Sequence, residues 1–98
     1  MGYITMEVES EGIDHTWNFF YGEYVEDKWV ARLADYKLRV FHRFEAESIE
    51  SCFDLLAEYL NQNAVVIDIF GNKMEHNYIE MLNQKMDIAG RHRLRSYF

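Results

Sequence analysis

Apolar and polar side chains alternate along residues 3–9 and again along residues 15–21. This period of two is typical of strands that bury one face. Residues 10–14 separate the two runs and include Gly12, which can adopt the positive φ of a tight turn. The pattern therefore predicts an N-terminal β-hairpin.

Two aromatic residues of this region are expected to lie outside the core. If the alternation continues, Phe20 and Tyr24 lie on the face opposite Trp17. Exposed aromatic side chains often mark contact surfaces. The alternative is that the chain's own helix covers this face.

Residues 28–34 fit two interpretations, a helix capped by Asp27 or a strand with Trp29, Ala31 and Leu33 toward the core. The strand is favoured because the next segment, residues 37–44, alternates clearly, and a short connection would make a meander. The residues that this second alternation directs inward are Leu38, Val40, His42 and Phe44.

The stretch from residue 47 to residue 70 predicts a helix followed by a strand. Ser48 is placed as the N-cap, Glu50 suits the first turn, and residues 61–63 end the helix. Residues 64–70 are rich in β-branched side chains and too few for an independent helix, which predicts a buried central strand. The apolar face of the helix comprises Ile49, Cys52, Phe53, Leu56, Tyr59 and Leu60.

A second helix is predicted over residues 73–89. Asn72 and Glu75 resemble a capping box at its start, and Gly90 is placed to end it. Residues 91–98 alternate and predict an edge strand with a basic outer face. The apolar stripe of this helix comprises Met74, Tyr78, Met81, Leu82, Met86 and Ala89.

These elements predict one domain over residues 1–98 of the α+β class. An antiparallel N-terminal β-meander of three to four strands is followed by helix, strand, helix and strand, with two helices packed on one sheet. The sequence has neither an apolar run long enough to span a membrane nor a signal-peptide pattern, so we expect a cytoplasmic protein.

Charge is distributed unevenly along the chain. The net charge is −7, and residues 1–27 contain seven acids but neither lysine nor arginine. Such a region repels nucleic acid phosphates and attracts basic surfaces. The candidate partner-binding residues, in the hairpin region and on the first helix, are Glu7, Glu9, Glu11, Asp14, Phe20, Glu23, Tyr24, Glu26, Asp27, Glu47, Glu50, Asp54 and Glu58.

Motifs of known chemistry are missing from the sequence. The five glycines form neither a phosphate-binding loop nor a nucleophile elbow, and the four histidines and single cysteine lack metal-ligand spacing. We therefore assign no catalytic, cofactor-binding or metal-binding residue. Cys52 has no internal disulfide partner and is expected to be buried on the helix.

Asp68 supports an alternative function. It precedes a strand-to-helix turn, a position where open sheets often place ligands. With Glu7 or Glu9 it would hold Mg²⁺ in a metal-dependent nuclease or phosphotransfer enzyme. This hypothesis requires the carboxylates to converge.

The element order resembles a shortened ribonuclease H-like layout. This resemblance implies the alternative function, a metal-dependent nuclease or phosphotransfer enzyme. The run from Trp29 to Leu60, an extended pair, residues 44–48 and an amphipathic helix, resembles the HicB antitoxin pattern. Neither resemblance includes a specific motif, and the glycine and proline turns usual in that antitoxin family are missing, so no family is assigned.

The first functional hypothesis is a non-enzymatic, acidic protein-binding module that blocks a basic partner, including a nucleic-acid-binding protein. Phage-encoded inhibitors of host defence, immunity proteins and antitoxins act in this way. The tail at residues 91–98 contains three arginines and no acid. It is expected to pair either with the acidic hairpin of its own chain or with that of a second copy, giving a homodimer.

Overall fold

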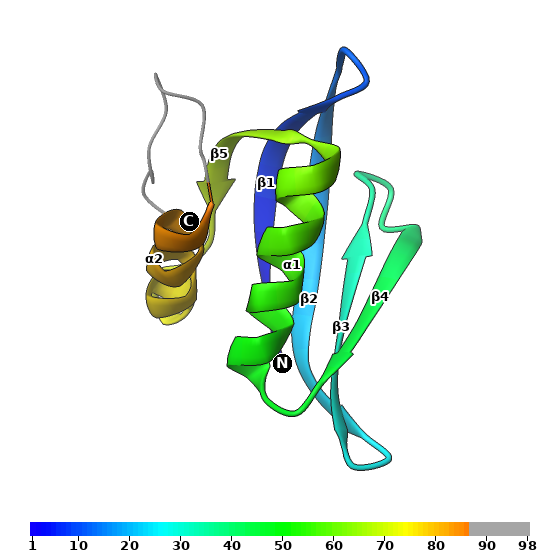
Figure 1. The fold of residues 1–98 in the computed structure, drawn as a ribbon, viewed down its shortest axis with the longest axis vertical. Coiled ribbons are helices and arrows are strands. Elements are labelled where there is room, and N and C mark those ends of the chain that lie inside the picture. The colour runs from blue at the N-terminus through cyan, green and yellow to red at the C-terminus, as the bar shows by residue number, and fades with distance from the viewer. Residues whose placement is uncertain (87–98) are drawn as a thin grey trace.

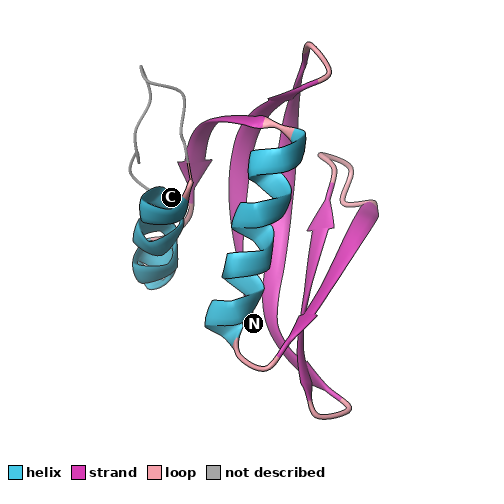
Figure 2. Ribbon diagram, in the orientation of Figure 1, coloured by secondary structure: helices cyan, strands magenta, loops and turns pink. Residues whose placement is uncertain are grey.

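The computed structural model describes residues 1–86 and shows two layers, an antiparallel five-stranded sheet and two helices on one of its faces (Figure 1). The strand order is β4-β3-β2-β1-β5. Neither described helix is long and apolar enough to span a membrane. The elements are β1 (Gly2–Ser10), β2 (Ile13–Val25), β3 (Lys28–Ala34), β4 (Val40–Ala46), α1 (Ile49–Asn63), β5 (Val65–Phe70), the short 3-10 helix η1 (Lys73–Glu75) and α2 (His76–Lys85) (Figure 2).

This architecture confirms the predicted α+β class, with an N-terminal meander and two helices packed on one sheet. The predicted strand over residues 91–98, and with it the homodimer that it would form, lies outside the described residues. The predicted end of the second helix at Ala89 and Gly90 also lies outside them.

β1 and β2 form the predicted hairpin, with a turn at Glu11 and Gly12 that both have positive φ. β2 is longer than expected and contains a bulge between Phe20 and Glu23, where Gly22 has a φ of 95°. Because the bulge shifts the alternation, Tyr24 pairs with Trp29 on the helix-bearing side. The prediction that Tyr24 shares the outer face with Phe20 is therefore wrong.

Residues 28–34 form a strand, as the favoured interpretation predicts, but β4 begins only at Val40. The Asp35 carboxylate accepts hydrogen bonds from the backbone N–H groups of Lys37 and Arg39, at 2.9 and 3.0 Å, and closes a loop. These bonds, first that of Arg39, lower the pKa of Asp35. Leu38 and Val40 are 60% and 52% exposed, so their predicted inward positions are wrong.

α1 begins and ends close to the predicted limits. The Ser48 hydroxyl accepts a hydrogen bond from the Ser51 backbone N–H at 3.0 Å, which confirms the N-cap. Cys52, Phe53, Leu56, Ala57 and Leu60 are buried against the sheet, as the helical spacing indicates. Burial raises the pKa of the Cys52 thiol.

β5 does not occupy the predicted central position. Among the described strands it pairs only with β1 and lies at the edge of the sheet. Val66 and Ile69 are buried, whereas Val65 is exposed. One buried face is enough to account for its apolar composition.

The second helical segment is shorter and more irregular than predicted. The Asn72 side chain caps it by accepting a hydrogen bond from the Met74 backbone N–H at 3.0 Å. Met74 is 83% exposed and not part of the core, whereas Ile79, which the predicted stripe omits, is fully buried. Glu75, expected to complete a capping box, is buried beside β1.

Phe53 lies at the centre of the core. Its ring is fully buried and meets Phe19 and Tyr21 of β2 edge-on, with centroids 5.1 and 4.8 Å away. On its other side it stacks against Tyr78 of α2 at 4.7 Å. One side chain thus joins both helices to the sheet.

Replacing Phe53 with alanine should lower the free energy of unfolding by about 3–5 kcal/mol, because it leaves a cavity where three elements meet. Denaturant unfolding followed by circular dichroism measures this loss. Ile13, which is exposed, provides the control, since Ile13→Ala should change stability by no more than about 0.5 kcal/mol. Equal losses in the two variants would contradict the central role of Phe53.

Candidate protein-binding surface

Both helices pack on the same side of the sheet, and no described helix lies on the other side (Figure 1). We call this other side the open face. Side chains of directly opposite residues on paired strands lie on the same face, so the register shows which residues share it. Four of the candidate acids and one candidate aromatic residue belong to the open face: Glu7, Glu9, Asp14, Glu23 and Phe20.

Four acids of β1, β2 and β5 are close neighbours on the open face. Glu7 is directly opposite Asp68, and Glu9 is directly opposite Asp14. Glu7 and Glu9 are two residues apart on one strand and therefore point to the same side. We call these four residues the acidic cluster. Like charges in directly opposite positions repel each other, so the cluster lowers the stability of the sheet.

The basic residues of the open face lie on β3 and β4, away from the acidic cluster. Arg32 of β3 pairs with Glu23, and Arg43 of β4 pairs with Glu45. Within the described residues, Glu7, Glu9 and Asp14 form no ion pair. The negative charges of Glu7, Glu9 and Asp14 are thus not offset by a described base of the sheet.

An aromatic pair lies on the open face near the start of β1. Tyr3 and Phe20 are opposite each other, with ring centroids 5.7 Å apart, and Tyr3 is 44% exposed. Between this pair and the acidic cluster, the Thr5 hydroxyl donates a hydrogen bond to the Asn18 side-chain oxygen at 2.8 Å. The surface therefore places aromatic side chains, which are enriched in protein interfaces, beside acids that can steer a basic partner.

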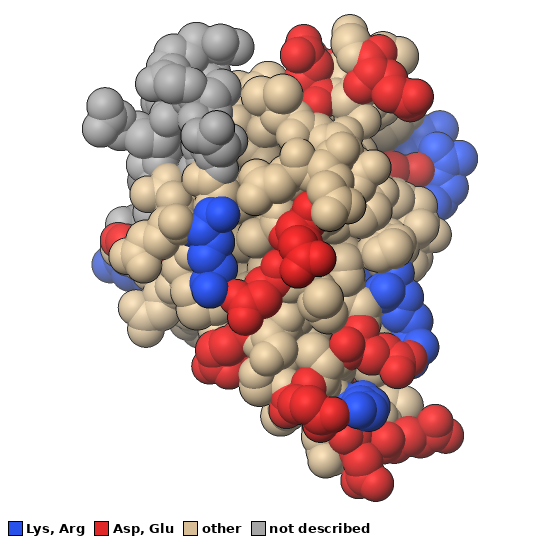
Figure 3. Space-filling view, in the orientation of Figure 1, with Lys and Arg blue, Asp and Glu red and all other residues tan. Residues whose placement is uncertain are grey.

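The remaining hairpin acids do not join this cluster. Glu11 lies in the turn between β1 and β2, while Glu26 and Asp27 form the turn between β2 and β3. These turns are at opposite ends of the molecule, whose longest extent is 39 Å (Figures 1 and 3). The acidic block of the sequence is therefore not one patch in the structure.

The first helix carries a separate set of acids. Glu50, Asp54 and Glu58 are exposed at intervals of four residues and form a diagonal band across the helix-bearing side (Figure 3). Lys85 of α2 pairs with Asp54 at 2.7 Å. We call these three acids the helix band. Like charges at this spacing repel one another, and the helix band lies on the opposite side from the acidic cluster.

Glu47, the last of the predicted acids, forms an ion pair within the chain. Its carboxylate pairs with the Lys28 ammonium group at 2.6 Å, just before α1. This hydrogen bond raises the pKa of Lys28. Glu47 therefore adds less free negative charge than its position suggested.

Two residues of interest were not among the predicted site residues. Tyr3 follows the alternation of β1, and that alternation alone was a sufficient signal to place it outside the core. Glu75 lines a pocket between η1 and β1, and its place in an apparent capping box gave no indication of this. Its burial depends on how η1 packs.

One pair of acids meets the requirement of the magnesium hypothesis that the carboxylates converge. Glu7 and Asp68 are neighbours, whereas Glu9 is opposite Val65. Within residues 1–86, however, no group of three or more potential metal-ligating side chains is close enough to hold an ion. The Glu7 and Asp68 pair fits a binding protein as well as it fits an enzyme, so we propose no second function.

Comparisons with protein families, with curated protein sequences and with solved structures gave no match.

Removing one acid of an opposed pair should stabilise the protein. We expect Glu9→Gln to raise the free energy of unfolding by about 0.2–1 kcal/mol at low salt, because it removes repulsion from Asp14. Denaturant titrations measure the change, and added salt should reduce it. In an Asp14→Asn background the gain should disappear. A gain that persists in that background would show that the two carboxylates do not interact.

Proposed function

We propose that this chain is a non-enzymatic binding protein whose open face docks on a basic partner protein and blocks it. The observation that supports the proposal is the acidic cluster itself, in which carboxylates of three strands face one another in register. The arrangement lowers stability and is not needed to complete the core. Binding of a cationic surface would relieve the repulsion.

The acids and the aromatic pair would contribute differently to binding. Exposed carboxylates speed the encounter with a basic surface, and salt screens this effect. Tyr3 and Phe20 supply apolar area at the same face and would slow dissociation. A partner that uses both must be basic and must carry an apolar patch beside its basic residues.

A partner with a nucleic-acid-binding surface fits these requirements. Such surfaces are rich in lysine and arginine, and they accept negative charge at regular spacing. A chain that covers one of them would act as an inhibitor. Phage-encoded inhibitors of host defence, immunity proteins and antitoxins are the classes to which this proposal points.

The experiment compares two variants of equal charge. Glu7→Gln/Glu9→Gln removes two acids from the open face, and Glu50→Gln/Glu58→Gln removes two from the helix band. Each tagged protein is used to capture partners from a bacterial lysate, from about 0.05 M to about 0.5 M salt. We expect the wild type and the helix-band variant to retain one basic protein at low salt, and the open-face variant to lose it.

Because both variants have the same net charge, a general effect of charge would weaken them equally. Equal loss in the two variants would contradict a specific open-face site. Capture that does not change with salt would contradict the electrostatic mechanism. Purified partner and isothermal titration calorimetry then give the affinity of each variant.

A further inference from the structure

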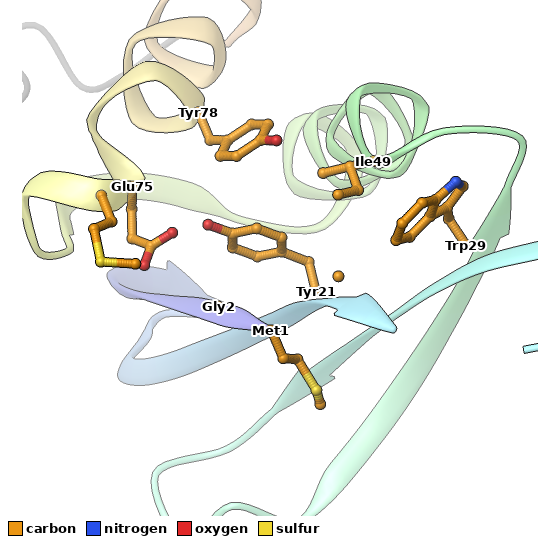
Figure 4. A pocket seen from close by; sticks show the side chains of 9 residues that line it. Met1, Gly2, Tyr21, Trp29, Ile49, Glu75 and Tyr78 are labelled. Carbon is orange, nitrogen blue, oxygen red and sulfur yellow. The ribbon is translucent and has the colours of Figure 1, made fainter. Parts of the chain in front are cut away.

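A pocket of about 270 Å³ lies where the start of β1 meets the first turns of the two helical segments. Figure 4 shows Glu75 at one end of the pocket, Tyr21 and Tyr78 along it, and Trp29 with Ile49 at the other end. The pocket is on the helix-bearing side and is separate from the acidic cluster. Its lining is mainly aromatic and aliphatic.

The acid in this pocket is buried. Glu75 is only 5% exposed, and within the described residues its carboxylate forms neither a hydrogen bond nor an ion pair. Buried carboxylates are normally paired, because removing the charge from water is costly. Burial accordingly raises the pKa of Glu75, and the amino group of Met1 opposes this rise.

The Tyr21 hydroxyl and the Glu75 carboxylate both lie close to Gly2. A Cβ atom at residue 2 would be only 2.7 Å from the Tyr21 hydroxyl oxygen and 2.8 Å from a Glu75 carboxylate oxygen, so only glycine fits here without a shift of these side chains. Both side chains line the pocket, and their oxygens lie near each other in Figure 4. Two oxygens around one space can accept hydrogen bonds from an ammonium group, which has three donors.

Most groups around the pocket also favour a cation; the exception is the Met1 amino group, which is itself positive. Glu50 at the start of α1 is close enough to act on the Tyr78 hydroxyl, whose pKa is raised by burial first and then by Glu50 and Glu75. Tyr78 therefore stays neutral at physiological pH. Aromatic faces such as those of Tyr21 and Trp29 attract cations and pack well against an alkyl stem.

We infer that this pocket binds an alkylammonium group, with the ammonium at Glu75 and the Tyr21 hydroxyl and the stem along the aromatic wall. The group belongs either to a free amine or to a lysine side chain of another protein. Both have the same chemistry at the site. The inference does not depend on the acidic cluster or on the proposed partner.

The experiment uses n-butylamine and Nα-acetyl-lysine N-methylamide as probes, with butanol as the neutral equivalent of butylamine. Nuclear magnetic resonance of the full chain follows the Trp29 indole and the tyrosine rings during titration. We expect both amines to shift these signals and butanol to leave them unchanged. Tighter binding of the lysine derivative identifies a protein side chain as the occupant, and tighter binding of butylamine identifies a free amine.

Two variants test the role of the buried acid. Glu75→Gln should weaken amine binding by about tenfold or more, because it removes a charge-assisted hydrogen bond. Gly2→Ala should weaken it by displacing the Tyr21 hydroxyl and the Glu75 carboxylate, which the added Cβ would meet at 2.7 and 2.8 Å, while the charge of Glu75 is kept. Glu80→Gln, an exposed acid of α2 beside His76, is the matched control and should bind as the wild type does.

Amine binding should also depend on pH. The titratable groups around the site are Glu75, Glu50, Tyr21, Tyr78 and the amino group of Met1. Only ionised Glu75 attracts the ammonium directly, so binding should weaken as the pH falls through the raised pKa of Glu75. In Glu75→Gln this dependence should be lost.

Stability measurements show whether Glu75→Gln remains folded. Since the pKa of Glu75 is raised in the folded state, the folded chain holds that proton more tightly than the unfolded chain. Wild-type stability should therefore fall as the pH rises from about 4, the ordinary pKa of glutamate, through the raised pKa. Glu75→Gln lacks this decrease and should be at least as stable as the wild type at neutral pH.

Three results would overturn the inference. Butanol binding as tightly as butylamine would show an apolar pocket without a cation site. Equal amine binding by the wild type and Glu75→Gln would exclude the acid as the acceptor. No response to either amine would show that the site takes no added alkylammonium group. The open-face variant Glu7→Gln/Glu9→Gln should bind the amines normally, which separates this test from that of the proposed function.

Discussion

The ring of Phe53 determines how the two layers meet. It stacks on Tyr78 of α2 and meets Phe19 and Tyr21 of β2 edge-on, so moving either helix would open a gap in the aromatic core. Both helices are therefore held on one face of the sheet. In β1, β2 and β5 the residues that alternate away from this face turn to the opposite side, and there the acidic cluster forms.

The free energies of charge repulsion and of aromatic burial explain why the sheet tolerates the acidic cluster. Two opposed carboxylates cost about 0.2–1 kcal/mol per pair on an exposed sheet surface. A single buried aromatic ring contributes several times that amount, of the order of 3–5 kcal/mol. The core thus tolerates two repelling pairs, Glu7 with Asp68 and Glu9 with Asp14. A surface for a basic partner can be maintained without loss of the fold.

Capping and alternation patterns in the sequence predicted the structure correctly where a residue's environment is determined by its neighbours along the chain. The Ser48 cap and the alternation of β1 are examples. These patterns failed where strand pairing decides: the bulge beside Gly22 moved Tyr24 to the other face, and the position of β5 depends on its pairing with β1. They also missed a local loop, in which the Asp35 side chain binds the backbone of Lys37 and Arg39 and Leu38 turns outward. For the site, charge alone selected Glu7, Glu9 and Asp14, but the position of Glu7 opposite Asp68 follows from the strand order.

The acids of this chain act over different distances because they are solvated differently. Glu7, Glu9 and Asp14 of the acidic cluster are exposed to water, so they act through a long-range field that salt weakens. Glu75 is enclosed by aromatic and aliphatic side chains, where an ionic contact is stronger but forms only with a group that enters the pocket. The first kind suits the capture of a large charged surface. The second discriminates by size and shape, since a ligand must replace the water that the carboxylate has lost.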